Sequence, residues 1–148
     1  MVKTISILGS TGSIGVNALE VISNLKNCFK VKYLSTHKNI DLLVSQIKKH
    51  KPKAVAVVDE AAAKKVKSTL DAMEIKLLSG RVGLLDLSQR NDLDLMLNGL
   101  VGASGMQPTI NAIKAGVNVA LANKESLVMA GNIINKELEN SDAKLLPV

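Results

Sequence analysis

Aromatic residues, cysteines and long apolar runs are all scarce in this sequence of 148 residues. Aromatics amount to 1%, so the chain lacks the platforms on which many nucleic-acid binders stack bases. Cys28 is the only cysteine, which excludes an internal disulfide; with two histidines it leaves no set of metal ligands, and we expect a buried or half-buried thiol. The apolar runs are far shorter than the roughly 20 residues that span a bilayer. We therefore expect a cytoplasmic protein that binds neither nucleic acid nor membrane.

The positive charge is concentrated in the first third of the chain. Residues 1–53 contain nine lysines and two acidic residues, a balance of +7, whereas the remainder has ten basic and eleven acidic residues, a balance of −1. A positive field in that part would attract a phosphorylated ligand. With 47% hydrophobic residues, the chain has enough apolar material for a full core, and we expect one domain over residues 1–148.

A glycine turn near the N-terminus is the first motif that points to a ligand. Residues 9–15 read Gly-Ser-Thr-Gly-Ser-Ile-Gly, and they stand between the apolar run 5–8 and a stretch with helical periodicity. Gly9 would let the chain turn out of the strand, Gly12 would let backbone approach a ligand, and Gly15 would let the helix pack closely on the strand. The order strand, glycine turn, helix indicates a binding site for a dinucleotide.

The chemistry of this turn suits an anion. The free N–H groups of the first helical turn would bind a pyrophosphate, and Ser10, Thr11 and Ser13 could add hydroxyl donors, with Ser13 also capping the helix. The spacing G-x-x-G-x-x-G lacks the G-K-[ST] ending of a triphosphate loop, so a triphosphatase is disfavoured. A tight turn without any ligand is the alternative.

The segment that would read the adenosine ribose favours NADPH over NADH. Residues 29–35 predict a strand with Phe29, Val31 and Tyr33 on one face. In a dinucleotide-binding unit the ribose contact lies about 20 positions past the glycine turn, and here residues 35–39 read Ser-Thr-His-Lys-Asn, without an acidic residue for a free 2′-hydroxyl. Lys38, helped by the side chains around it, could hold a 2′-phosphate. The alternative is a polar loop whose Asn39 caps the next helix.

Strands and helices alternate along the rest of the chain. We expect helices over residues 40–50, 61–72, 80–88, 108–115 and 127–138, and strands over 54–58, 75–79, 92–97, 118–121 and 143–148. Asp59 and Ser126 are candidate helix caps, and residues 98–105 form a second loop of small residues, which either approaches a cofactor or serves as a flexible connection. This alternation predicts an α/β fold of Rossmann-like, doubly wound type, with a mostly parallel sheet and helices on both faces.

Three segments together resemble the N-terminal domain of the 1-deoxy-D-xylulose 5-phosphate reductoisomerase family. They are residues 8–15, residues 121–128 (Leu-Ala-Asn-Lys-Glu-Ser-Leu-Val) and residues 145–148 (Leu-Leu-Pro-Val). The likeness covers the chain from end to end, and the second segment is far more specific than the glycine turn. Homoserine dehydrogenase and aspartate-semialdehyde dehydrogenase share parts of the pattern and remain alternatives, as does a free-standing nucleotide-sensing module.

The resemblance implies an NADPH-dependent oxidoreductase of isoprenoid precursor synthesis, homodimeric at full length. It would rearrange 1-deoxy-D-xylulose 5-phosphate and reduce the product to 2-C-methyl-D-erythritol 4-phosphate, with Mg²⁺ or Mn²⁺ holding the substrate. Together with the residues singled out above, the motif match gives Gly9, Thr11, Gly12, Ser13, Ile14, His37, Lys38, Asn39, Asn123 and Glu125 as cofactor-binding and Lys124 as substrate-binding. The family often has glycine at the position of His37, so that contact departs from its pattern.

The same resemblance implies that the chain is a fragment. In the family, Leu-Leu-Pro-Val continues into Asp-Ser-Glu, which begins the metal site, whereas this sequence ends at Val148. We therefore expect no metal ligand set and no catalytic residue within these residues, and we expect the chain to bind NADPH without turnover. For Lys124 and Glu125 the alternative is a surface ion pair of little energetic value.

Overall fold

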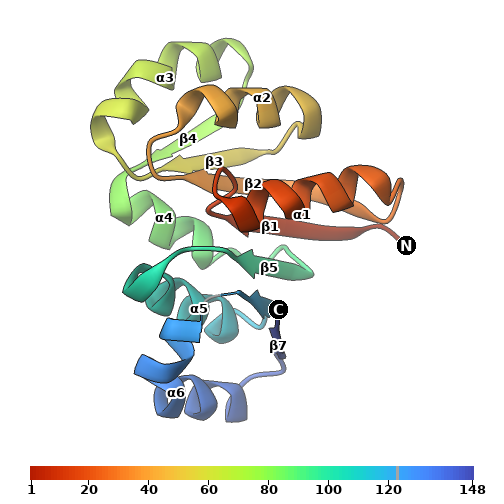
Figure 1. Cartoon of the computed structure of the whole chain (residues 1–148), viewed down its shortest axis with the longest axis vertical. Coiled ribbons are helices and arrows are strands. Elements are labelled where there is room, and N and C mark those ends of the chain that lie inside the picture. Colours follow the sequence, from red (N-terminus) through yellow and green to blue (C-terminus); the bar gives the residue numbers. More distant parts are fainter. Residues whose placement is uncertain (123) are drawn as a thin grey trace.

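A parallel sheet of seven strands organises the chain in a computed structural model that describes residues 1–122 and 124–148. The strands are β1 (Lys3–Leu8), β2 (Phe29–Thr36), β3 (Ala54–Val57), β4 (Lys76–Ser79), β5 (Leu95–Asn98), β6 (Asn118–Leu121) and β7 (Leu145–Pro147). Their order is β4-β3-β2-β1-β5-β6-β7, and every neighbouring pair is parallel (Figure 1). The chain winds outward from β1 in one direction and then from β5 in the other, which is the doubly wound arrangement.

Helices cover both faces of this sheet. The helices of the described ranges are α1 (Ser13–Asn24), α2 (Ile40–His50), α3 (Glu60–Ala72), α4 (Gly80–Ser88), α5 (Met106–Lys114) and α6 (Lys124–Glu139), with the short 3-10 helix η1 (Gly102–Gly105) before α5. One apolar core joins the sheet to α1, α2 and α3, and a second joins it to α4, α5 and α6 (Figure 1). The expected Rossmann-like α/β fold is confirmed.

The strand β3 shows how the sequence builds both cores at once. All four of its residues are buried, and they alternate between the faces. Ala54 and Ala56 belong to the core under α4 to α6, whereas Val55 and Val57 belong to the core under α1 to α3. A continuous apolar run suits a strand that is covered on both sides, and this prediction is confirmed.

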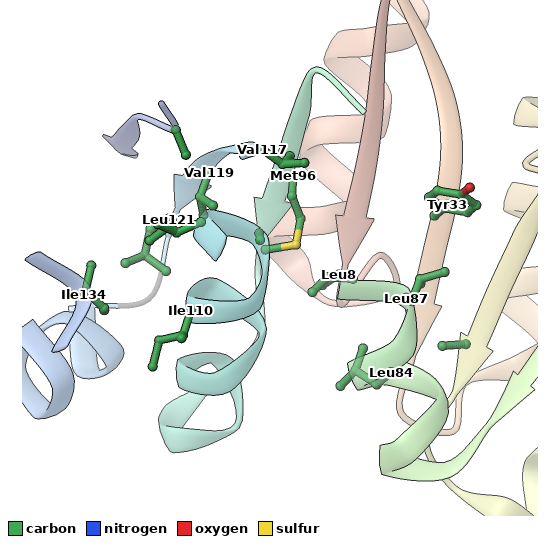
Figure 2. Close-up of a cluster of buried hydrophobic side chains, with 14 of the residues drawn as sticks. Leu8, Tyr33, Leu84, Leu87, Met96, Ile110, Val117, Val119, Leu121 and Ile134 are labelled. Carbon is green, nitrogen blue, oxygen red and sulfur yellow. The ribbon is translucent and has the colours of Figure 1, made fainter. Parts of the chain in front are cut away.

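The core on the side of α4 to α6 extends across the whole sheet. Figure 2 shows Leu8, Met96 and Val119 on the sheet, with Leu84 and Leu87 of α4 packed on the same cluster. Because Leu8 ends β1 and is fully buried there, the glycine turn begins on a rigid base.

A register shift changes the face of one predicted core residue. Ile5 pairs with Val31, but Ser6 pairs with Tyr33, so Lys32 is an extra residue in β2. Such a bulge reverses the alternation of side chains beyond it. Val31 therefore packs on the α1 side with Phe29, whereas Tyr33 lies in the opposite core (Figure 2). The prediction that all three share one face is wrong for Tyr33.

Asp59 and Asn39 cap their helices, whereas the two serines do not. The Asp59 carboxylate accepts from the N–H groups of Ala61 and Ala62 at 2.9 and 3.4 Å, as expected. Helix α1 instead has Gly12 as its N-cap, without a side-chain bond, and Ser13 is its first helical residue. Ser126 lies inside the first turn of α6, which begins at Lys124. Both serines were predicted as caps because the two helices were expected to begin just after them. The helices begin earlier, at Ser13 and at Lys124, so both serines are helical residues.

Cys28 is exposed, so the prediction of a buried or half-buried thiol is wrong. The reason is its place in the turn between α1 and β2, where Asn27 has a left-handed φ of 65° and neither core reaches the side chain. None of the helices in the described ranges has the length and apolar character that a bilayer crossing requires.

Candidate functional site

A cleft lies at the carboxyl ends of the strands where the sheet changes winding direction. Its volume is about 380 Å³, and the glycine turn after β1, the loop after β2 and the loop after β5 form three of its sides, with α4 and the residue after β3 completing the lining. Open α/β sheets bind their ligands in such a crevice. The glycine turn and the ribose-reading segment, 20 to 30 residues apart in the sequence, therefore lie around one cavity.

Two glycines of the turn occupy positions that exclude a side chain. Gly9 has a φ of 75°, and a Cβ there would lie 3.1 Å from the Gly99 carbonyl oxygen. At Gly15 a Cβ would overlap the carbonyl oxygen of Gly9, so α1 packs directly on the turn. The roles expected for both glycines fit this geometry. Gly12 is exposed and lines the cleft, and a Cβ there would meet only the Gly9 carbonyl oxygen, at an ordinary contact distance of 3.5 Å.

Hydrogen bonds from β2 and α2 fix the turn. The Ser35 hydroxyl oxygen accepts from the N–H of Gly9 at 2.9 Å, and its carbonyl accepts from the N–H of Ser10 at 2.8 Å. The Gln46 amide nitrogen donates to the Ser10 carbonyl at 2.8 Å, while the Ser10 hydroxyl donates to the Gln46 amide oxygen at 2.8 Å. Ser10 is fully buried, and its hydroxyl is bonded within the protein. The Ser10 hydroxyl was expected to donate to a phosphate, but it does not face the cleft opening.

Gln46 is a supporting residue that sequence reasoning missed. It is 7% exposed and lies on the apolar face of α2, between Leu43 and Ile47. A polar side chain on a buried helix face is a signal in itself, because a buried amide needs partners. The sequence could not indicate that the partner is Ser10.

The N-terminus of α1 lies beside the cleft, because its N-cap Gly12 is one of the lining residues. No acidic residue stands in the first turn of this helix, so nothing offsets the positive end of its dipole. Thr11 lines the cleft, with its hydroxyl 2.6 Å from that of Thr36. Ser13 and Ile14 are exposed at the start of the helix. The chemistry of this end suits an anion, because the Thr11 and Ser13 hydroxyls and the N–H groups at the start of α1 are donors.

The loop after β2 forms the second side. Ser35 and Thr36 are buried, and the chain then becomes exposed at His37, Lys38 and Asn39. His37 and Asn39 line the cleft, whereas Lys38, between them in the sequence, is exposed and is not one of the lining residues. The Asn39 side-chain oxygen accepts from the N–H of Leu42 at 3.2 Å, so its expected alternative role as a helix cap is real and leaves the amide nitrogen available to donate.

The loop after β5 is the third side, and it is firmly held. The buried Asn98 amide donates to the Gly105 carbonyl and the Thr109 hydroxyl, both at 2.8 Å, and its oxygen accepts from the N–H of Leu100 at 3.1 Å. Gly99, Leu100 and Val101 line the cleft. The loop is thus an ordered wall of the cavity, not a flexible connection. Arg81, which sequence reasoning also missed, reaches the cleft from α4.

A smaller hollow of about 200 Å³ continues from the same loop. Gly99, Leu100 and Val101 belong to both cavities, and the hollow adds Ile14 and Glu125 to the lining. Lys124 is exposed beside Glu125 at the start of α6. The expected site residues on α1 and α6 therefore lie along one edge of the sheet. Asn123 lies outside the residues that the structure describes.

The sheet order and the glycine turn at its switch point define a Rossmann-type nucleotide-binding domain. The family model described as 1-deoxy-D-xylulose 5-phosphate reductoisomerase matches residues 5–131, and the chain belongs to that family.

Named relatives agree with this assignment. The 1-deoxy-D-xylulose 5-phosphate reductoisomerase of Chloroherpeton thalassium is 45% identical over 146 residues, which are 99% of this chain and 38% of the relative. That of Halothermothrix orenii is 43% identical over 148 residues, 100% of this chain and 38% of the relative. The chain thus spans well under half the length of these curated relatives.

Solved structures of the same family share the fold. The reductoisomerase from Zymomonas mobilis in complex with NADPH superposes with a TM-score of 0.93 at 29% identity, over 99% of this chain and 38% of that one. A DOX-P reductoisomerase with NADPH, fosmidomycin and magnesium gives 0.91 at 32%, over 98% and 36%. A hyperthermophilic archaeal homoserine dehydrogenase in complex with NADPH gives 0.66 at 15% identity over 99% and 43%, which shows a shared fold alone.

Proposed function

We propose that this chain is the NADPH-binding domain of a reductoisomerase that converts 1-deoxy-D-xylulose 5-phosphate to 2-C-methyl-D-erythritol 4-phosphate, a step of isoprenoid precursor synthesis. The observation that carries the proposal is the cleft at the switch point, which shares Gly99, Leu100 and Val101 as lining residues with the hollow beside Glu125. Two neighbouring cavities suit the two ends of an extended dinucleotide. The family membership and the NADPH complexes of its relatives support the choice of ligand.

The residues on the glycine turn fit a pyrophosphate. The cleft lining contains no Asp or Glu among the described residues, and Gly12 leaves room for close approach. In this proposal Gly9 and Gly12 shape the turn, Thr11 donates through its hydroxyl, and Ser13 and Ile14 donate through the backbone at the positive end of α1.

The loop after β2 selects the phosphorylated ribose. Lys38 supplies the charge for the 2′-phosphate, and His37 and Asn39 supply donors beside it. His37 stands where the family often has glycine, and it is exposed on the loop beside Lys38. A carboxylate that would prefer a free 2′-hydroxyl does not line this part of the described cleft.

The hollow beside α6 receives the reactive end of the cofactor. NADPH supplies the hydride for the reduction of the rearranged aldehyde. The Glu125 carboxylate accepts from donors of the nicotinamide side, Asn123 contacts the same end, and the Lys124 ammonium attracts the phosphorylated sugar. These residues bind and orient, and none of them is assigned a bond-making step.

The metal of the reaction does not fit the residues described here. Within residues 1–122 and 124–148, no group of three or more His, Cys, Asp or Glu side chains could hold an ion. We propose that Mg²⁺ or Mn²⁺ acts through ligands elsewhere in the whole enzyme, which would be a cytoplasmic homodimer and would also supply the remaining substrate contacts. Magnesium is present in solved structures of relatives.

Calorimetric titration and a turnover assay test the proposal together. We expect the chain to bind NADPH more tightly than NADH, and to show no oxidation of NADPH with 1-deoxy-D-xylulose 5-phosphate and Mg²⁺. Absence of NADPH binding would refute the assignment of the cleft. Metal-dependent turnover by this chain alone would refute the proposal that the metal ligands and the remaining substrate contacts lie elsewhere in the whole enzyme. Oxidation of NADPH with aspartate semialdehyde, which would be reduced to homoserine, would favour the dehydrogenase alternative.

A further inference from the structure

Among the described residues, no Phe, Tyr or Trp side chain lines the cleft where an adenine ring could bind. The chain has one Tyr, one Phe and no Trp. Tyr33 is fully buried, with its hydroxyl on Asp92, and Phe29 packs against the core on the α1 side, so neither lines the cavity. A purine that binds in a protein gains most from a flat surface against its face. Another planar group must therefore supply this surface.

Among the described lining residues, Arg81 and His37 carry the large planar, delocalised groups. They differ in how firmly they are held. His37 is exposed on its loop, whereas Arg81 is half-buried at the start of α4 and its Nη1 donates to the Ser104 carbonyl at 2.9 Å. No carboxylate of the described residues forms an ion pair with Arg81. The guanidinium is thus anchored at one nitrogen and is not engaged by a described carboxylate.

The surroundings of Arg81 suit a base better than a phosphate. Val58 after β3 and Leu84 of α4 line the same cavity, and Leu100 lines it from the β5 loop. These apolar side chains would cover the edge and second face of a purine, whereas the donors for phosphate lie on the glycine turn. A guanidinium is weakly hydrated and stacks on aromatic faces, and one that is already anchored loses little freedom on binding.

We propose that the Arg81 guanidinium is the surface on which the adenine ring of the bound dinucleotide stacks. This inference rests on the proposed function, because it assigns a further specificity residue to the same cofactor site. Arg81 touches the base and takes no part in the hydride step. Removal of a stacking surface weakens nucleotide binding by about tenfold.

The test uses two probes and two substitutions, with binding measured by calorimetry. The probes are 2′,5′-ADP, which carries the 2′-phosphate, and ADP, which lacks it. Arg81→Leu removes the plane and the charge, while Arg81→Lys keeps the charge and a donor for Ser104 but removes the plane. We expect both variants to weaken both probes by about tenfold, with the ratio between the probes unchanged.

Arg90 provides the matched control, because it stands just after the far end of α4 and pairs with Asp86 at 3.4 Å. Arg90→Leu removes the same charge and should leave the affinity for both probes unchanged. Thermal unfolding midpoints of all variants show whether the fold is retained.

Three results would overturn the inference. A loss confined to 2′,5′-ADP would mean that Arg81 contacts the 2′-phosphate, and full affinity of Arg81→Lys would mean that only its charge or its hydrogen bond matters. Unchanged binding by Arg81→Leu would remove the residue from the site. If the unsubstituted chain binds neither probe, both the proposed function and this inference are refuted. If the unsubstituted chain binds the probes and Arg81→Leu binds them equally well, only this inference is refuted.

Discussion

At the scale of single residues, the ligand preference of the cleft depends on which charges surround it. Lys38 stands on the exposed loop between His37 and Asn39, and the described cleft lining contains no carboxylate. A free 2′-hydroxyl would find no acceptor of the usual kind there, whereas a 2′-phosphate would find a cation.

Lys38→Ala should therefore weaken NADPH binding by roughly tenfold and leave NADH binding nearly unchanged, because the lost contact is charge-assisted and specific to the phosphate. Calorimetric affinities for both cofactors give the ratio directly. Lys53 is another exposed lysine in the basic part of the chain. Lys53→Ala is therefore the control for the loss of one positive charge from the electrostatic field of the protein. Equal losses for the two cofactors would contradict this role of Lys38.

Gln46 supports the turn from behind, and its removal should act on stability first. Gln46→Leu leaves the buried Ser10 hydroxyl and carbonyl without their amide partners, so we expect a loss of about 1–3 kcal/mol in the free energy of unfolding. Urea denaturation measures this loss. Gln89→Leu changes an exposed glutamine at the C-cap of α4 in the same way and should be close to neutral. A Gln46→Leu chain as stable as the original would show that the buried network contributes nothing.

The residue types in the sequence indicated the ribose loop and the glycine turn, but not the hydrogen-bond partners that hold these segments in place. The Ser10 hydroxyl was expected at the phosphate, yet it donates inward to Gln46, which is 36 positions away. Arg81 and Ser104 meet across 23 positions. The sheet order brings these distant segments together. Patterns within short stretches of a single sequence carry no information about such long-range contacts.

At the scale of elements, the closest packing in the site is that of α1 against the turn that precedes it. Gly15→Ala would push a methyl group into the Gly9 carbonyl, so α1 and the turn must move apart. We expect a loss of more than about 2 kcal/mol in unfolding free energy, together with weaker NADPH binding.

Gly131→Ala is the matched substitution in α6, because a Cβ there would meet no atom within 4 Å. Removal of a helix glycine should be neutral or stabilise by up to about 1 kcal/mol. Chemical denaturation compares the two variants. A Gly15→Ala chain that behaves like Gly131→Ala would mean that the turn tolerates a wider approach of α1.

The periodicity of the elements predicted their order and most of their bounds, and it failed where local geometry intervened. The extra residue Lys32 in β2 turned Tyr33 to the other face. Helix α6 contains a residue with non-helical angles, Ala130, and Leu127 on its expected buried face is 40% exposed. A bulge or a kink breaks the period itself, so no pattern based on the period can reveal it.

At the scale of the whole molecule, one polar cluster ties β2 to the segment before β5. The Tyr33 hydroxyl donates to the Asp92 carboxylate at 2.9 Å, and the Lys32 ammonium lies 2.6 Å from the same group. Burial raises the pKa of Tyr33, and the hydrogen bond to Asp92 raises the pKa of Lys32. Burial alone would raise the pKa of Asp92, but hydrogen bonds from Lys32 and Tyr33 outweigh it and hold it below its ordinary 3.8.

These shifts predict how stability depends on pH. The contribution of Asp92 is present above pH 3.8 and is lost as the pH falls through its lower folded pKa, whereas the contributions of Lys32 and Tyr33 are lost only as the pH rises through their raised values. Asp92→Asn should lower the thermal midpoint at neutral pH, and the difference from the original chain should shrink in acid. Asp142→Asn, at an exposed position, should show no such trend. A difference that stays constant down to pH 2 would contradict the linkage.

The assembly of these elements carries the central claim that NADPH lies across the switch point of the sheet. The most direct measurement is an amide NMR titration of this 15.7 kDa chain with NADPH. The account predicts shifts clustered in residues 9–15, 35–39 and 98–105, with smaller changes elsewhere. Shifts confined to another face of the molecule, or the same pattern and affinity with NADH, would contradict it.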